Sequence, residues 1–226
     1  MSDPRRVLLV GATGLIGTRV MQECVGRTDV RLIALTRREA SMPAGARMEM
    51  LVADPAEWGR SLATVAPEAV ICALGTTWRK AGGDEAAFRA VDQELVLRVA
   101  QAAKAAGVSN FVFVSSVGAD LASRAFYLRV KGEVETALRK LRFHRLDILR
   151  PGLLRGPRAG DRRIAERLGI VFSPLMDLFL HGERRRFRSL DARVVARAAL
   201  EGAREKAQGT FVREHDAILR LERRLV

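Results

Sequence analysis

The sequence predicts an α/β fold in which a doubly wound parallel sheet carries helices on both faces. Strand and helix signals alternate along the 226 residues, a pattern typical of parallel sheets. Several strand signals are continuous apolar runs, such as residues 69–74, and such strands are buried on both faces. The length suits one well-buried domain over residues 1–226.

The first strand and the first helix flank a glycine turn. The apolar run 7–10 leads into GATGLIG, and apolar residues at helical spacing follow directly. Gly11 allows a sharp turn, Gly14 leaves room for a pyrophosphate, and Gly17 lets the helix pack on the strand. This arrangement predicts a dinucleotide-binding Rossmann fold with phosphates at the helix N-terminus, although a tight turn without a ligand is the alternative. The turn residues expected at the cofactor are Gly11, Thr13, Gly14, Leu15, Ile16 and Gly17.

Two arginines after the second strand, residues 30–35, indicate which cofactor binds. Arg37 lies 20 residues after Gly17. An acidic residue at this place binds the ribose 2'-hydroxyl of NAD, whereas arginine accommodates the 2'-phosphate of NADP. Because Arg37 or Arg38 can pair with that phosphate, we expect NADP(H) to be preferred over NAD(H). A solvated arginine pair is the alternative in so basic a chain.

Further contacts with the cofactor are expected after the next two strands. A short strand over residues 48–52 precedes Asp54, whose carboxylate either accepts from the adenine amino group or caps the following helix. The strand over 69–74 ends at Gly75, over which the middle of the cofactor is expected to pass. A long helix is predicted over residues 88–102.

A serine, a tyrosine and a lysine form the candidate catalytic group. Ser116 follows the buried strand 111–114, and Tyr127, the only tyrosine, precedes Lys131 by four residues on a predicted helix. A phenol suits proton donation to a carbonyl oxygen as hydride arrives at carbon, and a nearby ammonium favours the reverse step. Ser116 would donate to the same oxygen, with Ser115 as its rival. A packed tyrosine beside a solvated lysine is the alternative.

These stretches resemble the short-chain dehydrogenase/reductase superfamily, in the extended branch that carries the GATGLIG turn. Within it, the chain is similar to the oxidoreductases related to the human Tat-interacting protein, in the segments ALGTTWRKAGG, FVFVSSVGAD, FYLRVKGEVE and LRPGLLRG. The resemblance implies an NADP-binding Rossmann domain with Ser116, Tyr127 and Lys131 at the catalytic positions. It also implies that Lys131 hydrogen-bonds the nicotinamide ribose. Asp92 departs from the family pattern, because many extended members carry asparagine there.

The last third of the chain is less informative. Residues 155–188 combine nine arginines with an apolar run, and we expect residues 155–190 to form a small C-terminal substrate-binding cap. An apolar pocket rimmed by positive charge suits a hydrophobic acidic substrate or an anionic membrane surface. A buried helix with solvated arginines is the alternative. A helix over 194–203, a strand over 209–212 and a helix over 217–225 complete the prediction.

Composition narrows the classes of partner. The net charge of +13 favours anions, but the arginines are spread along the chain and aromatic residues make up only 5%, so no specific nucleic-acid surface is expected. No transmembrane segment or signal peptide is predicted. Cys24 and Cys72 are expected to be reduced, buried thiols of a cytoplasmic protein, and no metal-site spacing is present.

The leading hypothesis is therefore an NADP(H)-dependent oxidoreductase that acts on a small carbonyl or alcohol. Epimerase-type chemistry, in which the cofactor is reduced and reoxidised, is a variant of it. The rival is a regulatory or redox-sensing protein that binds NADP(H) with little or no turnover. The substrate and the oligomeric state are left open.

Overall fold

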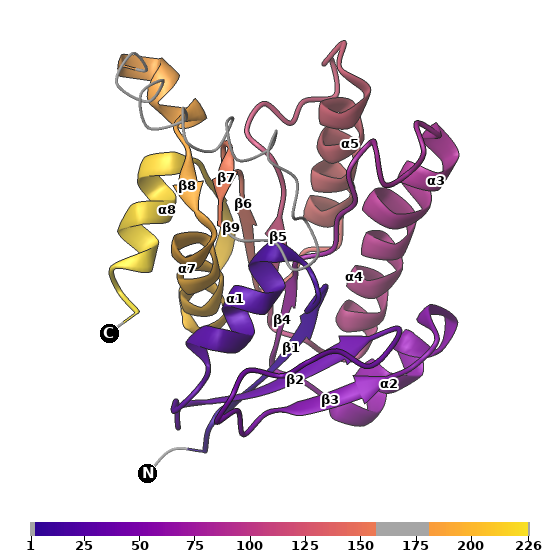
Figure 1. The fold of residues 1–226 in the computed structure, drawn as a ribbon, viewed down its shortest axis with the longest axis vertical. Helices are drawn as coiled ribbons and strands as arrows, with labels where there is room; N and C mark the ends of the chain where they lie inside the picture. Colours follow the sequence, from indigo (N-terminus) through magenta and orange to yellow (C-terminus); the bar gives the residue numbers. More distant parts are fainter. Residues whose placement is uncertain (1–2, 157–180, 226) are drawn as a thin grey trace.

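The computed structural model describes residues 3–156 and 181–225, which form a seven-stranded sheet with helices around it (Figure 1). The strand order is β3-β2-β1-β4-β5-β6-β9, and every neighbouring pair is parallel. The order reverses between β1 and β4, as in a doubly wound sheet, so the predicted fold class is confirmed. The strands are β1 (Arg5–Val10), β2 (Val30–Thr36), β3 (Glu49–Val52), β4 (Ala69–Cys72), β5 (Asn110–Val114), β6 (Arg145–Leu149) and β9 (Gly209–Arg213).

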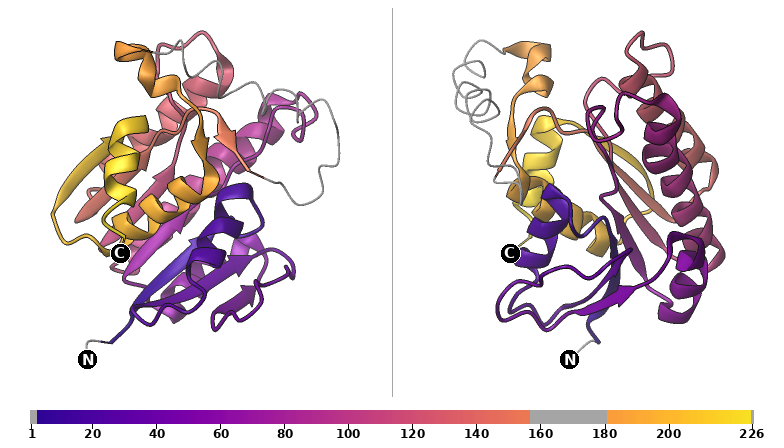
Figure 2. Two further views of the ribbon diagram at one scale, coloured as in Figure 1. Left: turned by 60° about the vertical axis from the view of Figure 1, so that its left-hand side comes forward. Right: turned by 45° about the vertical axis from the view of Figure 1, so that its right-hand side comes forward.

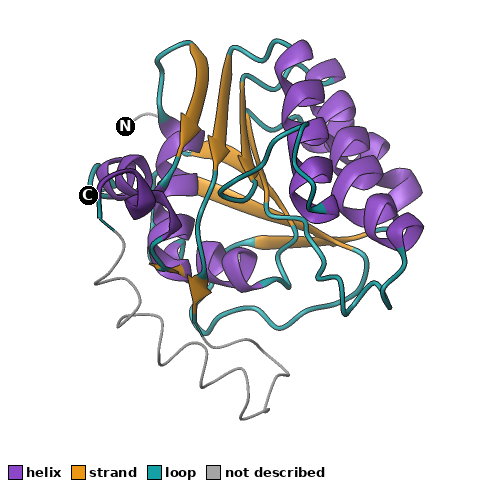
Figure 3. Cartoon of the chain, turned by 90° about the horizontal axis from the view of Figure 1, so that it is seen from above, coloured by secondary structure: helices purple, strands orange, loops and turns teal. Residues whose placement is uncertain are grey.

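Helices cover both faces of the sheet, as the view from above shows (Figure 3). One face carries α1 (Leu15–Glu23), α7 (Ala192–Arg204) and α8 (His215–Glu222). The other carries α2 (Trp58–Val65), α4 (Val96–Ala105) and α5 (Phe126–Lys140). Each face therefore has its own apolar core.

The central strand β1 explains why the apolar runs are continuous. Val7 and Leu9 pack into the core on the α1 side, while Leu8 and Val10 pack into the core on the α4 side. Successive side chains of a strand point to opposite faces, and all four are fully buried here. Each such side chain stabilises the fold by roughly 1.5–3 kcal/mol.

Two elements differ from their predicted form. Strand β4 ends at Cys72 rather than at residue 74, because its partner β1 ends at Val10. The amide of Ala73 makes the last hydrogen bond between the two strands, to the carbonyl of Val10 (2.9 Å). The predicted helix over residues 88–102 is three segments: α3 (Glu85–Arg89), a π-helical segment η2 (Ala90–Leu95) and α4. Asp92 lies within this π segment and is fully buried.

The C-terminal part adds a small parallel ribbon at the carboxyl edge of the sheet (Figure 2). It pairs β7 (Leu154–Arg155) with β8 (Leu190–Asp191), and the 3-10 helix η3 (Gly182–Phe187) precedes β8. The predicted cap over residues 155–190 falls mostly on residues 157–180, which lie outside the described part of the chain.

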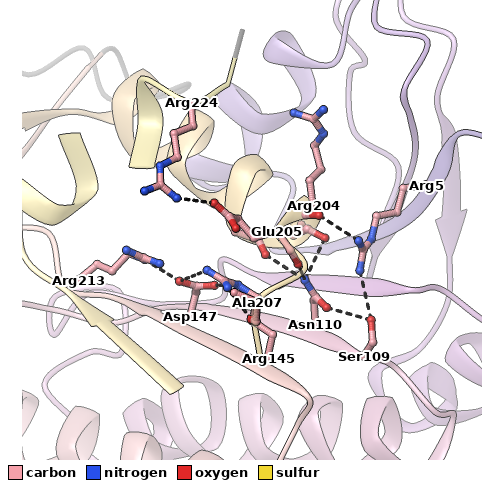
Figure 4. A network of polar contacts seen from close by, with 12 residues as sticks. Arg5, Ser109, Asn110, Arg145, Asp147, Arg204, Glu205, Ala207, Arg213 and Arg224 are labelled. Atoms are coloured by element: carbon pink, nitrogen blue, oxygen red, sulfur yellow. Dashed lines mark hydrogen bonds and ion pairs between the residues drawn. The ribbon is translucent and has the colours of Figure 1, made fainter. Parts of the chain in front are cut away.

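A buried charge cluster joins β6 to β9 (Figure 4). Arg145 and Arg213 both donate to the carboxylate of Asp147, each through its Nε at 2.6 Å. Asp147 is fully buried, and Arg145 is only 1% exposed. Beside it, the Asn110 amide donates to three carbonyls at the end of α7, at 2.8 to 3.3 Å, which satisfies acceptors that a helix C-terminus leaves unpaired. We refer to Arg145, Asp147 and Arg213 as the arginine cluster.

Candidate functional site

A cavity of about 460 Å³ opens at the carboxyl ends of the central strands. Its walls come from the turn after β1, the loop after β4, the end of β5 and the first turns of α5. This is the place where the strand order reverses, which is where open α/β sheets bind ligands. The predicted site residues that line it are Thr13, Gly14, Leu15, Ile16, Gly75, Tyr127 and Lys131.

The three glycines of the first turn have different roles. Gly11 has a φ of +88°, and a Cβ there would lie 2.5 Å from the carbonyl oxygen of Ala73. A Cβ at Gly17 would lie 2.1 Å from the oxygen of Gly11, so both glycines are required for packing. Gly14 lines the cavity, and the nearest atom to its hypothetical Cβ is the Gly11 oxygen at 3.3 Å. Its missing side chain keeps that wall open.

Helix α1 presents an uncapped N-terminus to the cavity. Its N-cap residue, Gly14, has no side chain to accept from the first amides, and the first turn holds no acidic residue. The amide of Thr18 makes the first intrahelical bond, to the Gly14 carbonyl at 2.9 Å. Free amides at the positive end of a helix bind anions, and Arg19, which also lines the cavity, adds positive charge. The turn therefore fits a pyrophosphate.

Tyr127 lies on the first turn of α5 and lines the same cavity. Its ring meets the ring of Phe88 edge to face, with 5.7 Å between centroids and 72° between planes. The side chain is 38% exposed, so this contact orients the ring while the phenol stays accessible. The ammonium of Lys131 is 6.0 Å from the centre of the Tyr127 ring.

Lys131 is buried and paired with a carboxylate that the sequence left in doubt. Its Nζ lies 2.9 Å from Asp92 Oδ1, and both side chains are at most 3% exposed. Burial alone lowers the pKa of Lys131, but the charges of Asp92 and Tyr127 raise it, and the net result is a pKa above the ordinary lysine value. Lys131 is therefore charged at neutral pH. The other oxygen of Asp92 accepts from the amide of Thr76 at 2.7 Å.

The two candidate serines differ in what their hydroxyls contact. Ser115 lines the cavity, but its hydroxyl donates to the buried Glu135 at 2.6 Å, so its proton is already engaged. Glu135 also accepts two hydrogen bonds from Arg150, at 2.6 and 2.9 Å. The Ser116 hydroxyl makes only a long contact of 3.4 Å to the carbonyl of Val117, and Ser116 is not among the residues that line the cavity. The role of Ser116 stays a prediction.

Besides Gly11 and Gly17, which pack inside the first turn, three predicted cofactor residues lie outside the cavity wall. Arg37 and Arg38 directly follow β2 and are exposed. Because Leu35 pairs with Val10, they lie at the same edge of the sheet as the glycine turn. Asp54 accepts from the amide of Ala56 at 2.8 Å and caps the 3-10 helix η1 (Pro55–Glu57), so the structure shows the capping alternative.

Sequence reasoning missed several residues of the cavity wall. Thr18, Arg19 and Gln22 follow the glycine turn on α1, and their helical spacing from Leu15 was the available signal. Lys80 comes from the turn at residues 78–83, where nothing in the sequence predicts its direction. Asp92 lies four residues after the buried Phe88, so helical spacing puts it on the buried side, but the spacing does not say that a cavity lies there.

The cysteines are buried as predicted, and burial raises the pKa of both Cys24 and Cys72 to about 12. In the described residues, no three His, Cys, Asp or Glu side chains gather in a group that could hold a metal ion. None of the helices described is both long and apolar enough to span a bilayer.

Residues 11–172 match a family model described as NAD(P)H-binding. Curated relatives cover much of the chain. "Protein fmp52, mitochondrial" of Emericella nidulans is 37% identical over 185 residues, which is 76% of this chain and 79% of that protein. "Protein fmp-52, mitochondrial" of Neurospora crassa is 33% identical over 238 residues, which is 98% of this chain and 97% of that protein.

Solved structures share the fold at low sequence identity. MoeE5 in complex with UDP-glucose and NAD has a TM-score of 0.69 at 16% identity, with 100% of this chain and 82% of that chain covered. UDP-N-acetylglucosamine 4-epimerase from Bacillus cereus has a TM-score of 0.64 at 18% identity, with 96% and 82% covered. These similarities place the fold among NAD-binding and epimerase structures.

The relatives correct one expectation and establish the family. The predicted cytoplasmic location is wrong, because the curated relatives are named as mitochondrial proteins. The finer resemblance, to the oxidoreductases related to the Tat-interacting protein, stays a prediction. The family match over residues 11–172 and the relatives above 30% identity show that this chain belongs to the NAD(P)H-binding family.

Proposed function

We propose that the protein is an NADP(H)-dependent oxidoreductase that acts on a small carbonyl or alcohol. One observation carries the proposal: an accessible phenol, Tyr127, and a buried ammonium, Lys131, line the same cavity as the uncapped N-terminus of α1. The helix end suits the phosphates of a dinucleotide, and the phenol and ammonium suit proton transfer. The curated relatives' names give no reaction, so the substrate class is inferred from the chemistry of these groups alone.

Several residues would hold the cofactor. The first amides of α1, at Leu15 and Ile16, would bind the pyrophosphate, Gly75 would leave room for the middle of the cofactor, and Lys131 would bind the nicotinamide ribose. Arg37 or Arg38 would pair with the 2'-phosphate, which NAD lacks. Bound NADP(H) supplies or accepts the hydride.

The remaining chemistry belongs to the protein side chains. Tyr127 donates its phenolic proton to the substrate oxygen during reduction and takes a proton back during oxidation. Lys131 stabilises the phenolate by its charge. Ser116 donates a hydrogen bond to the same substrate oxygen, and the engaged proton of Ser115 leaves Ser116 as the freer donor.

A screen of carbonyl compounds with NADPH tests the reaction. We expect NADPH consumption by the parent protein and a loss of at least about 10²-fold in turnover for Tyr127→Phe, with unchanged NADPH affinity. Phe126→Leu, which alters the adjacent ring and leaves the phenol in place, is the control. Turnover that survives Tyr127→Phe would show that another group transfers the proton.

Binding measurements test the cofactor preference. The double variant Arg37→Ala/Arg38→Ala should weaken NADPH binding by about tenfold or more and leave NADH binding unchanged, because only NADPH carries the 2'-phosphate. Arg31→Ala/Arg47→Ala removes two exposed arginines away from that edge and serves as the charge-matched control. Equal NADPH and NADH affinities in the parent would contradict the preference.

The position of Ser116 favours a second candidate function, that of an NADP(H)-binding regulatory protein. Ser116 is not on the described cavity wall, and without that donor the substrate oxygen lacks its expected partner. Tight NADPH binding without consumption of NADPH by any carbonyl in the screen would support this candidate over the enzyme.

A further inference from the structure

Asp92 is the acidic residue among the described side chains that line the cavity. It is fully buried, on the π segment η2, and its two oxygens have different partners. Oδ1 lies 2.9 Å from the ammonium of Lys131, and Oδ2 accepts from the amide of Thr76 at 2.7 Å. The carboxylate therefore joins the loop after β4 to helix α5.

Three elements supply the titratable groups that act on Lys131. Asp92 comes from η2, Tyr127 from α5, and the thiol of Cys72 from β4. Burial raises the pKa of the Cys72 thiol to about 12, so it is neutral near pH 7. The Phe113 ring of β5 lies 5.1 Å from the ammonium, and the other charged side chains of the cavity wall, Arg19 and Lys80, are cations. Asp92 is thus the one carboxylate among the described residues of this wall.

A buried ammonium without a counter-ion loses its proton readily. Desolvation disfavours the charged form of lysine and lowers its pKa by several units in documented cases. For Lys131 burial is the largest influence and acts in this direction, while the charge of Asp92 opposes it. The hydrogen bond from the Thr76 amide fixes the carboxylate beside Lys131, so the Asp92 charge continues to favour the protonated lysine.

We propose that Asp92 is a positioning residue that keeps Lys131 protonated and fixed beside Tyr127. The catalytic consequence rests on the proposed function, because only an oxidoreductase needs the ammonium next to the phenol. The protonation itself is a property of the protein without substrate or cofactor, so it is measurable even if the protein has no turnover.

Titration of Lys131 by NMR tests the proposal directly. The chain has only five lysines, so the Lys131 side-chain signal is assignable by comparison with Lys131→Gln. In Asp92→Asn, which keeps an acceptor for Thr76, we expect the titration midpoint of Lys131 to fall by about two pH units or more. An unchanged midpoint would overturn the proposal.

The single tyrosine gives a second readout. Because Tyr127 is the only tyrosine, the tyrosinate absorbance of the whole protein reports on it alone. In Asp92→Asn the tyrosinate absorbance should appear at higher pH than in the parent. The reason is that Lys131 has already lost its proton at that pH and no longer stabilises the phenolate by its charge.

Kinetics give a third readout if turnover is present. The alkaline limb of kcat/KM should move to lower pH in Asp92→Asn, because Lys131 loses its charge at lower pH in this variant. A change in the NMR titration without any turnover would reject the proposed function and retain the role of Asp92.

Glu133→Gln is the matched control. Glu133 also joins α5 to the helix that includes η2, through an ion pair with Arg89, but it is not in contact with Lys131. This variant removes one carboxylate from the same helix pair, and the Lys131 midpoint should stay at the parent value. A fall equal to that of Asp92→Asn would show a general effect of charge and contradict the proposal.

A double variant covers the case in which Asp92→Asn does not fold. If the defect is an unpaired buried ammonium, Asp92→Asn/Lys131→Met should fold, because replacement of both partners removes the charge that lacks a counter-ion. Unfolding of the double variant as well would show that Asp92 is required independently of Lys131, and the proposal would fail.

Discussion

Two buried carboxylates, Asp92 on the cavity wall and Asp147 in the middle of β6, have contrasting partners. Asp147 in the arginine cluster receives two guanidinium groups, and α7 covers it so closely that a Cβ at Gly202 would lie 3.2 Å from its Oδ2. Asp92 receives one ammonium and one backbone amide, and it lines a cavity. The carboxylate of Asp147 is therefore enclosed by protein, whereas that of Asp92 lies on the wall of the cavity.

The difference shows how the choice of cation matches the role of a buried pair. Arginine keeps its proton under all ordinary conditions, so the arginine cluster is a permanent set of charges. Lysine changes its protonation when its surroundings change, and it suits a site where protons move. Lys131 therefore lies on the cavity wall, where a proton can be exchanged, and the arginine cluster lies in the interior, where its charges only stabilise the fold.

The largest expected effect comes from breaking the arginine cluster. Asp147→Asn should reduce the free energy of unfolding by about 3–5 kcal/mol, because Arg145 is left buried with uncompensated charge. Asp92→Asn, the same chemical change, should cost about 1–3 kcal/mol, since Lys131 is able to lose its proton. Urea unfolding of both variants measures the two losses. A larger loss for Asp92→Asn would reverse the comparison.

A smaller effect is expected at the neighbouring serines, where a third buried carboxylate, Glu135, holds Ser115. Ser116→Ala should reduce turnover by about 10²-fold, the effect of losing one oxyanion donor, with unchanged stability. Ser115→Ala should reduce the free energy of unfolding by about 1 kcal/mol and change turnover only slightly, because its hydroxyl serves Glu135. Steady-state kinetics and urea unfolding distinguish the pair. The opposite assignment would identify Ser115 as the donor.

The smallest expected effect is a pH dependence of stability from Lys131. Its folded-state pKa lies above the ordinary lysine value of 10.5: burial is the largest single influence and lowers the pKa, but the charges of Asp92 and Tyr127 and the hydrogen bond to Asp92 together outweigh it. A raised pKa means that the folded protein holds this proton more tightly than the unfolded chain does. The stabilisation is therefore fully present below about pH 10 and declines as the pH rises through the folded-state pKa.

Comparison with Asp92→Asn/Lys131→Met isolates this contribution. The difference in unfolding free energy between parent and variant should be constant from neutral pH to about pH 10 and should shrink above it. A difference that grows with rising pH would mean that the pKa of Lys131 is lowered on folding, and that Asp92 does not offset its burial.

Local patterns determined the parts of this protein that the sequence alone predicts. Apolar runs identify buried strands because each residue of β1 meets one of two cores, and GATGLIG identifies the first turn because Gly11 and Gly17 have no room for a Cβ. The pairing of Tyr127 with Lys131 on one helix follows from a spacing of four residues. Each of these signals lies within a few neighbouring residues.

Contacts between distant segments were decided only by the tertiary structure. Asp92 and Lys131 are 39 residues apart and meet because the π segment that carries Asp92 packs against α5. Ser115 and Ser116 look equivalent in sequence, and only the packing of α5 brings Glu135 to one of them. Sequence spacing determines which side chains share an element, but burial and ion pairing depend on how the elements pack, and they set the charge that each group carries.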